Sequence, residues 1–218
     1  DSRTRDGVEI ALHVNAEQPA DLALARRLGA AGVGLFRTEF LYLSHAEPTG
    51  EDVQYRAYRE AVLAMAGKPV TLRTLDLGAD KAAGTALDVA PESNPALGLR
   101  GLRLSLARPQ LFERQLRAML RASAYGPVRV LLPMVAGLEE ARLARATFEH
   151  CRAVLARDGA PMAERVELGA MIEGPAAAPF TPAARTALQV LAGHLAVAIE
   201  NATLYRETRW YAGLLATL

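Results

Sequence analysis

The feature that most constrains this chain is a regular alternation of short apolar runs with longer amphipathic segments. The apolar runs predict strands over residues 8–14, 32–40, 70–72, 98–104, 128–134 and 166–172. Apolar residues at helical spacing predict helices over residues 19–28, 51–66, 108–123 and 138–156. Strands and helices that alternate in this order indicate an α/β fold, in which helices cover a parallel sheet.

Charged residues gather directly after the apolar run 70–72. They are Arg73, Asp76, Asp80 and Lys81. A buried parallel strand that ends in charge is typical of a strand whose carboxyl end faces a ligand. Because a guanidinium matches phosphate or carboxylate in geometry, Arg73 predicts a bound anion. Asp80 and Lys81 are either further contacts to that anion or part of a solvated loop.

The same pattern recurs at other predicted strands. Arg37, Arg100 and Glu173, like Arg73, come just after apolar runs. In a barrel of parallel strands such positions meet at one rim. We therefore expect the functional site at the carboxyl ends of the strands.

Two of these arginines belong to consecutive predicted strands. The backbones of Arg37 and Arg73 are then expected roughly 5 to 10 Å apart. Two guanidiniums with no carboxylate between them repel each other unless an anion lies there. The alternative is that Arg37 pairs with Glu39 or Asp76 and has only a structural role. Residue types alone leave both possibilities open.

Glu173 is the candidate metal ligand, because Mg²⁺ favours carboxylate and phosphate oxygens together. The alternative is a carboxylate that pairs with one of the arginines. The single cysteine, Cys151, lies on the apolar face of the predicted helix 138–156 and is expected to be a small core residue.

Composition narrows the classes of protein. The 218 residues suffice for one sizeable domain or two small ones, and a net charge of +1 argues against a dedicated nucleic-acid binder. Apolar runs stay well short of the ~20 residues that a membrane span needs, and the first residues do not read as a signal peptide. We therefore expect a cytoplasmic protein without a membrane partner.

Several longer blocks carry a family resemblance. They read GVGLFRTEFLYL, KPVTLRTLDLGADK, NPALGLRGLRLSL and GAMIEGPAAA. Over about residues 5–178 these blocks resemble the phosphoenolpyruvate-binding barrel of enzyme I, the phosphoenolpyruvate–protein phosphotransferase of the bacterial sugar phosphotransferase system. They are similar, more distantly, to pyruvate phosphate dikinase. The resemblance implies a TIM-like (βα)8 barrel and a kinase-like transferase that serves sugar transport.

The resemblance also implies roles for individual residues. In that family the barrel binds phosphoenolpyruvate and Mg²⁺, and the phosphoryl group passes to a histidine on a separate domain. Matched by motif, Arg37 and Arg73 resemble the phosphate-binding arginines, and Arg100 resembles a further substrate-binding arginine. Glu173 resembles a Mg²⁺ ligand. A phospho-carrier protein is the implied partner.

The later family blocks find no match in this sequence. They are a seventh strand that ends in Asn-Asp and an eighth strand that supplies a cysteine. The expectation is therefore an incomplete barrel of about six βα units over residues 1–178. Residues 179–218 resemble the last helix of GAF domains, with the spacing of a coiled-coil seam. The alternative is a helix that packs on its own barrel.

Three functional hypotheses follow. The first is an enzyme I-type phosphotransferase, although the chain is expected to be incomplete for turnover. The second is a module that binds phosphoenolpyruvate or phosphate without catalysis. The third is a regulatory chain, a fusion or chimera, in which the GAF-like helix mediates assembly. A six-stranded remnant exposes two sheet edges, so we also expect a homo-oligomer, most simply a dimer.

Overall fold

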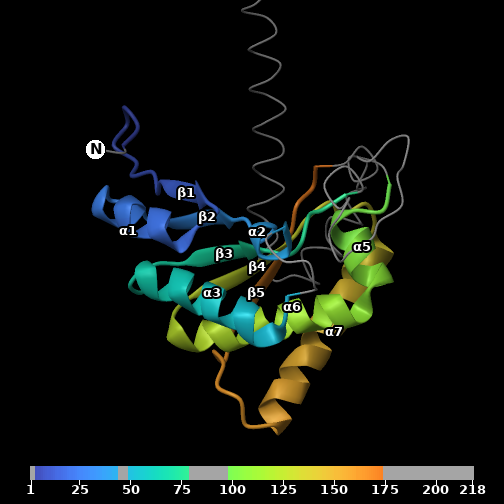
Figure 1. The fold of residues 1–218 in the computed structure, drawn as a ribbon. Coiled ribbons are helices and arrows are strands. Elements are labelled where there is room, and N and C mark those ends of the chain that lie inside the picture. Colours follow the sequence, from blue (N-terminus) through green and yellow to red (C-terminus); the bar gives the residue numbers. More distant parts are fainter. Residues whose placement is uncertain (1–2, 44–48, 79–97, 174–218) are drawn as a thin grey trace, which may run out of the picture.

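The structure, a computed structural model, describes residues 3–43, 49–78 and 98–173 of the chain. Its centre is a five-stranded sheet in which the strands are hydrogen-bonded in sequence order (Figure 1). All four pairings are parallel. The strands are β1 His13–Ala16, β2 Gly32–Phe36, β3 Val70–Arg73, β4 Val128–Leu132 and β5 Glu167–Ala170.

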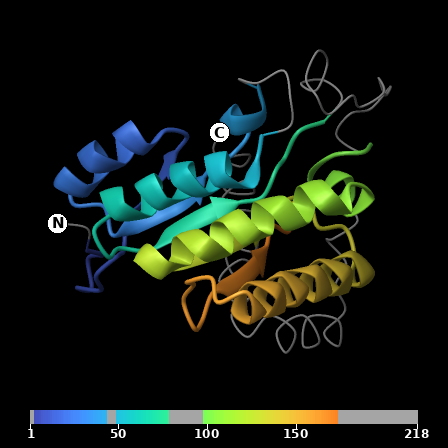
Figure 2. The same cartoon turned by 60° about the horizontal axis from the view of Figure 1, so that its bottom comes forward.

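Four long helices follow the first four strands and lie in a row on one face of the sheet (Figure 2). A parallel crossover is right-handed, so strands added always on the same side carry their helices to the same face. These helices are α1 Pro19–Arg27, α3 Glu51–Ala64, α6 Pro109–Ala122 and α7 Leu138–Arg157. Shorter helical elements are α2 Phe40–Leu43, α5 Gly101–Ala107 and the 3-10 turn η1 Ser123–Tyr125.

The core fills the space between the sheet and this helix layer. Val70 and Leu72 alternate along β3 and are completely buried, as are Leu116 and Met119 on α6. Every second side chain of a strand lies on the same face, as does every third or fourth side chain of a helix. These side chains therefore point toward each other. The α/β class predicted from the sequence is therefore confirmed.

Cys151 is a core residue, as predicted. Its side chain on α7 is buried, and the cysteine is free. Burial raises the pKa of the Cys151 thiol to about 11, so the residue stays protonated and chemically quiet at neutral pH.

The prediction of a strand over residues 98–104 is wrong. Gly101–Ala107 forms helix α5 instead, and Leu102 and Ser105, three positions apart, are both buried. A run of this length fits the period of a strand as well as that of a helix, and only packing decides between them. The described residues therefore hold five strands rather than six.

The first strand lies later in the chain than predicted. β1 begins at His13, opposite Gly32 of β2, whereas residues 8–12 are outside the sheet. Val8, Ile10 and Leu12 do alternate with other residues, but all three side chains are exposed. Alternation alone does not make a strand when no neighbouring strand pairs with it.

Some predictions fall outside the described residues. They are the predicted C-terminal helix of residues 179–218 and the possible anion contacts Asp80 and Lys81. Within the described part, no helix combines the length and the apolar character needed to cross a membrane.

Candidate anion-binding site

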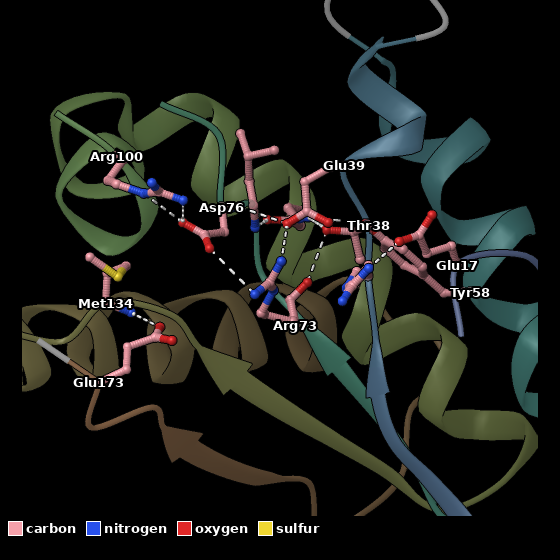
Figure 3. A network of polar contacts seen from close by, with 12 residues as sticks. Glu17, Thr38, Glu39, Tyr58, Arg73, Asp76, Arg100, Met134 and Glu173 are labelled. Carbon is pink, nitrogen blue, oxygen red and sulfur yellow. Dashed lines mark hydrogen bonds and ion pairs between the residues drawn. The ribbon is translucent and has the colours of Figure 1, made fainter. Parts of the chain in front are cut away.

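The carboxyl ends of the strands meet at one edge of the sheet, as parallel pairing requires. Phe36 lies opposite Leu72, and Leu132 lies opposite Ala170. The residues that follow these positions, Arg37 among them, therefore emerge side by side. Figure 3 shows the polar side chains that gather at this edge.

Arg73 is the centre of the cluster (Figure 3). Its Nη2 atom lies 2.8 Å from Glu39 Oε1, and its Nη1 atom lies 3.3 Å from Asp76 Oδ2. The three side chains are only 9 to 14% exposed, so their charges are largely shielded from water. The Nε–H of Arg73 is buried and has no acceptor among the described residues. One donor of the guanidinium fork is thus unused.

Asp76 links Arg73 to a second arginine. Its Oδ1 atom accepts from Arg100 Nε at 3.2 Å and from Arg100 Nη2 at 3.1 Å. The backbone N–H of Asp76 donates in turn to Glu39 Oε1 at 3.1 Å. The result is a chain of alternating charge, Glu39–Arg73–Asp76–Arg100, in which each group is oriented by its neighbours.

Arg100 reaches this chain from an unexpected element. It is the residue that precedes helix α5, not a residue at the end of a strand. The site residue expected from the sequence is therefore brought to the cluster, although the secondary structure predicted around it was wrong.

Arg37 has a different partner from either one considered in the sequence analysis. Its Nη1 atom is hydrogen-bonded to Glu17, the residue directly after β1, and not to Glu39 or Asp76. About half of each side chain is exposed, at 48% and 56%. An exposed ion pair contributes about 0–1 kcal/mol, so Arg37 is readily released to another anion.

Glu173 follows the end of β5 and lies at the same edge. One of its oxygens, Oε1, accepts from the backbone N–H of Met134 at 3.0 Å, and the side chain is exposed. Met134 adopts the left-handed φ of 57°, which is sparsely populated for a residue with a side chain. Among the described residues, no cluster of three or more His, Cys, Asp or Glu side chains is placed to hold a metal ion.

The arginines are not left without carboxylates, contrary to the simplest form of the expectation. In the free protein, Glu17, Glu39 and Asp76 neutralise Arg37, Arg73 and Arg100. An incoming anion must therefore compete with internal acids. What the arrangement offers chemically is a shielded guanidinium with a spare donor. It is flanked by Arg37, whose exposed partner is exchangeable, and by Arg100, which shares the carboxylate of Asp76 with it.

Two residues that matter for this geometry were missed in the sequence. Glu17 follows β1 just as Arg37 follows β2, so the rule applied to the other strand ends would have found it. Gln115 lies on the apolar face of α6, between Phe112 and Met119, and is completely buried. A polar residue on an apolar helix face was the available signal.

The fold and the cluster together define a class: an α/β protein whose arginines and carboxylates gather at the carboxyl ends of its parallel strands, the edge at which such folds commonly bind ligands. Residues 1–190 match the family described as PEP-utilising enzyme, PEP-binding domain. The chain belongs to this family. The match runs past residue 178, where the sequence predicted a domain boundary.

Curated relatives share the family. The chain is 49% identical over 183 residues to the phosphoenolpyruvate-protein phosphotransferase of Cupriavidus necator, a match that covers 82% of the chain and 31% of that protein. It is 45% identical over 175 residues to the protein of the same name from Geobacillus stearothermophilus, covering 80% of the chain and 30% of that protein. The chain thus spans about 30% of the length of these relatives. The predicted resemblance to enzyme I is confirmed.

Proposed function

We propose that this chain binds phosphoenolpyruvate at the carboxyl ends of β2 and β3, with Arg73 as the central phosphate ligand. The observation that supports this most is the state of the Arg73 guanidinium. It is shielded from water, held by two carboxylates, and keeps a buried donor without an acceptor among the described residues. In such surroundings a doubly negative phosphate gains more from a guanidinium than it would in water.

The neighbouring arginines complete the proposed binding site. Arg37 emerges beside Arg73, and its exposed pair with Glu17 costs little to break. Arg100 reaches the same cluster through Asp76. Three guanidiniums suit a ligand that carries both a phosphate and a carboxylate, because each group takes a bidentate partner.

Glu173 is the proposed Mg²⁺ ligand. Mg²⁺ is often bound by one or two carboxylates together with water and substrate phosphate oxygens, so one carboxylate at the edge of a phosphate site fits its preference. The Oε1 atom of Glu173 is occupied by the N–H of Met134, which fixes the carboxylate and leaves Oε2 to coordinate. When bound, the ion would neutralise part of the charge on the phosphate oxygens.

The relatives are named phosphoenolpyruvate-protein phosphotransferases. We propose the same reaction class for the protein to which this domain contributes, with a histidine of a phospho-carrier protein as acceptor. A second candidate is binding of phosphoenolpyruvate or phosphate without turnover. The internal pairing of all three arginines supports it to this extent: the cluster is complete without a ligand, and binding by exchange of ion pairs needs no further group.

The sheet supports a proposal about architecture. Strands in sequence order, all parallel and with their helices on one face, are the arrangement found along an arc of a (βα)8 barrel. Within the described residues, β1 and β5 each pair on one side only. Unpaired edges favour association, so we also propose that the chain forms a homodimer.

Calorimetric titration with phosphoenolpyruvate in the presence of Mg²⁺ tests the binding proposal. We expect the unmodified chain to release or absorb heat with a saturable isotherm. Arg73→Met should weaken binding by about 10- to 100-fold, the equivalent of a lost charged hydrogen bond.

Arg129→Met is the matched control. Arg129 is the second residue of β4 and pairs with Glu167 at 3.0 Å, near the amino ends of these strands. Arg129→Met removes a guanidinium and an ion pair from the same sheet, but it should leave the affinity for phosphoenolpyruvate unchanged. Absence of heat with the unmodified chain, or equal affinities for all three proteins, would rule the proposed site out.

A further inference from the structure

A buried amide lies beneath the anion site, where α6 meets the ends of β2 and β3. Gln115 Nε2 donates to Thr38 Oγ1 and to the Tyr58 hydroxyl, both at 3.1 Å. Its Oε1 atom accepts from the backbone N–H of Leu75 at 2.9 Å. Gln115, Thr38 and Tyr58 are all completely buried. The amide therefore uses both donors and its acceptor within the protein interior.

The groups that Gln115 holds adjoin the site. Thr38 directly precedes Glu39, and Leu75 directly precedes Asp76; these two carboxylates are the ones that bind Arg73. Thr38 Oγ1 also donates to the backbone carbonyl of Arg73 at 2.9 Å. Gln115 thus bonds to the side chain of Thr38 and to the backbone of Leu75, the residues that precede the two carboxylates of the cluster. Figure 3 shows Thr38 and Tyr58 beside Arg73 and Glu39.

A second buried amide fixes the orientation of the first. The Tyr58 hydroxyl donates to Gln54 Oε1 at 3.1 Å, and Gln54 Nε2 donates to the backbone carbonyl of Thr49 at 3.0 Å. Burial raises the pKa of Tyr58 far above its ordinary value, so the hydroxyl keeps its proton. Since that proton is given to Gln54, Tyr58 can only accept from Gln115. Thr38 Oγ1 likewise gives its proton to the Arg73 carbonyl. In the opposite orientation of the Gln115 amide, its oxygen would face these two hydroxyl oxygens with no proton between them, so that orientation is excluded.

We infer that Gln115 is a positioning residue of the anion site: it holds the ends of β2 and β3 so that Glu39 and Asp76 present the Arg73 guanidinium in one orientation. The inference rests on the proposed function. Gln115 does not reach the ligand. Because of Gln115, the Arg73 side chain is already ordered when an anion replaces Glu39 or Asp76 as its partner. Binding therefore does not have to order the Arg73 side chain.

The test compares Gln115→Met with Ser123→Ala. Methionine keeps the length of the side chain and removes the amide. Ser123 is also buried, and its Oγ atom accepts from the backbone N–H of Ala163 at 2.9 Å, but it lies past the far end of α6. Both changes remove the side-chain acceptor of a backbone N–H, that of buried Leu75 in one case and that of partly buried Ala163 in the other, so both are expected to lower the midpoint of unfolding.

Two readouts separate positioning from a general loss of stability. We expect Gln115→Met to raise the dissociation constant for phosphoenolpyruvate about tenfold and to accelerate hydrogen exchange at the Leu75 amide, while exchange along β4 is unchanged. Ser123→Ala should change neither readout. Thr38→Val removes the hydroxyl that links Gln115 to the Arg73 carbonyl, so it should weaken binding as Gln115→Met does. It replaces Gln115→Met in the test if Gln115→Met does not fold.

The outcomes distinguish the inference from the proposed function. If the unmodified chain does not bind phosphoenolpyruvate, the proposed function fails, and exchange at Leu75 still decides whether Gln115 orders the strand end. If the unmodified chain binds and Gln115→Met binds equally well, or if Leu75 exchanges alike in both, Gln115 is not a positioning residue.

Discussion

At the scale of single residues, Asp76 has the most demanding position in the site. It bridges two guanidiniums while only 9% exposed. Asp76→Asn keeps the shape but removes the charge, so Arg73 and Arg100 lose a shared counterion. We expect the free energy of unfolding, measured with urea at neutral pH, to fall by about 1.5–3 kcal/mol. Added phosphate should restore part of this loss, because an anion can replace the missing carboxylate.

Asp158→Asn is the control for this change. Asp158 pairs with Arg157, and both side chains are more than half exposed. Its neutralisation should alter the free energy of unfolding by no more than about 0.5 kcal/mol. Equal effects of the two substitutions would show that the Asp76 bridge is an ordinary surface pair.

The residues of the site were partly predictable for a physical reason. Parallel strands bring their carboxyl ends together, so a charged residue after each apolar run is a candidate, and this located Arg37, Arg73 and Glu173. The partners were not predictable, because pairing depends on side-chain direction and burial. Arg37 thus turns toward Glu17 of the neighbouring strand end rather than toward Glu39.

At the scale of elements, the start of helix α5 is fixed by one glycine. Gly101 has a φ of 54°, and a Cβ atom there would lie 2.9 Å from Met134 Cβ and 3.3 Å from Asp76 Oδ1. Gly101→Ala should therefore lower the free energy of unfolding by about 1–3 kcal/mol, through strain and overpacking. It should also displace Arg100 from Asp76, which a crystal structure of the variant would show.

Gly137→Ala provides the comparison, because Gly137 is likewise a glycine at the start of a helix: it directly precedes α7, as Gly101 is the first residue of α5. Its φ is −160°, and no described atom lies within 4 Å of the position that an alanine Cβ would take. We expect a change of less than about 1 kcal/mol. If alanine were tolerated equally at both positions, the close approach at Gly101 would not constrain the site.

The elements themselves show where sequence patterns suffice. The long helices α3, α6 and α7 lie within a few residues of the predicted ranges, because an apolar face repeated over several turns has only one reading. The segment 98–104 is too short for that. Its helix follows from the left-handed backbone conformation of Gly101 and from the burial of Leu102. The spacing of apolar residues in the sequence predicts neither of these.

At the scale of the whole molecule, the proposed association follows from the edges of the sheet. Light scattering at micromolar concentration should give twice the 23.3 kDa mass of one chain. The backbone groups on the outer sides of β1 and β5 have no strand partner within the described residues, and pairing with a second copy would satisfy them. A mass of one chain at all concentrations tested would contradict the proposal.

The central claim concerns a place in the molecule: the carboxyl ends of β2 and β3 hold the phosphate of phosphoenolpyruvate through Arg73. A crystal structure of the chain with phosphoenolpyruvate bound tests it most directly. The account predicts phosphate oxygens within hydrogen-bonding distance of the Arg73 guanidinium, with Arg37 turned away from Glu17 toward the same group. Phosphoenolpyruvate bound elsewhere, with the pairs of Arg73 to Glu39 and Asp76 intact, would contradict it.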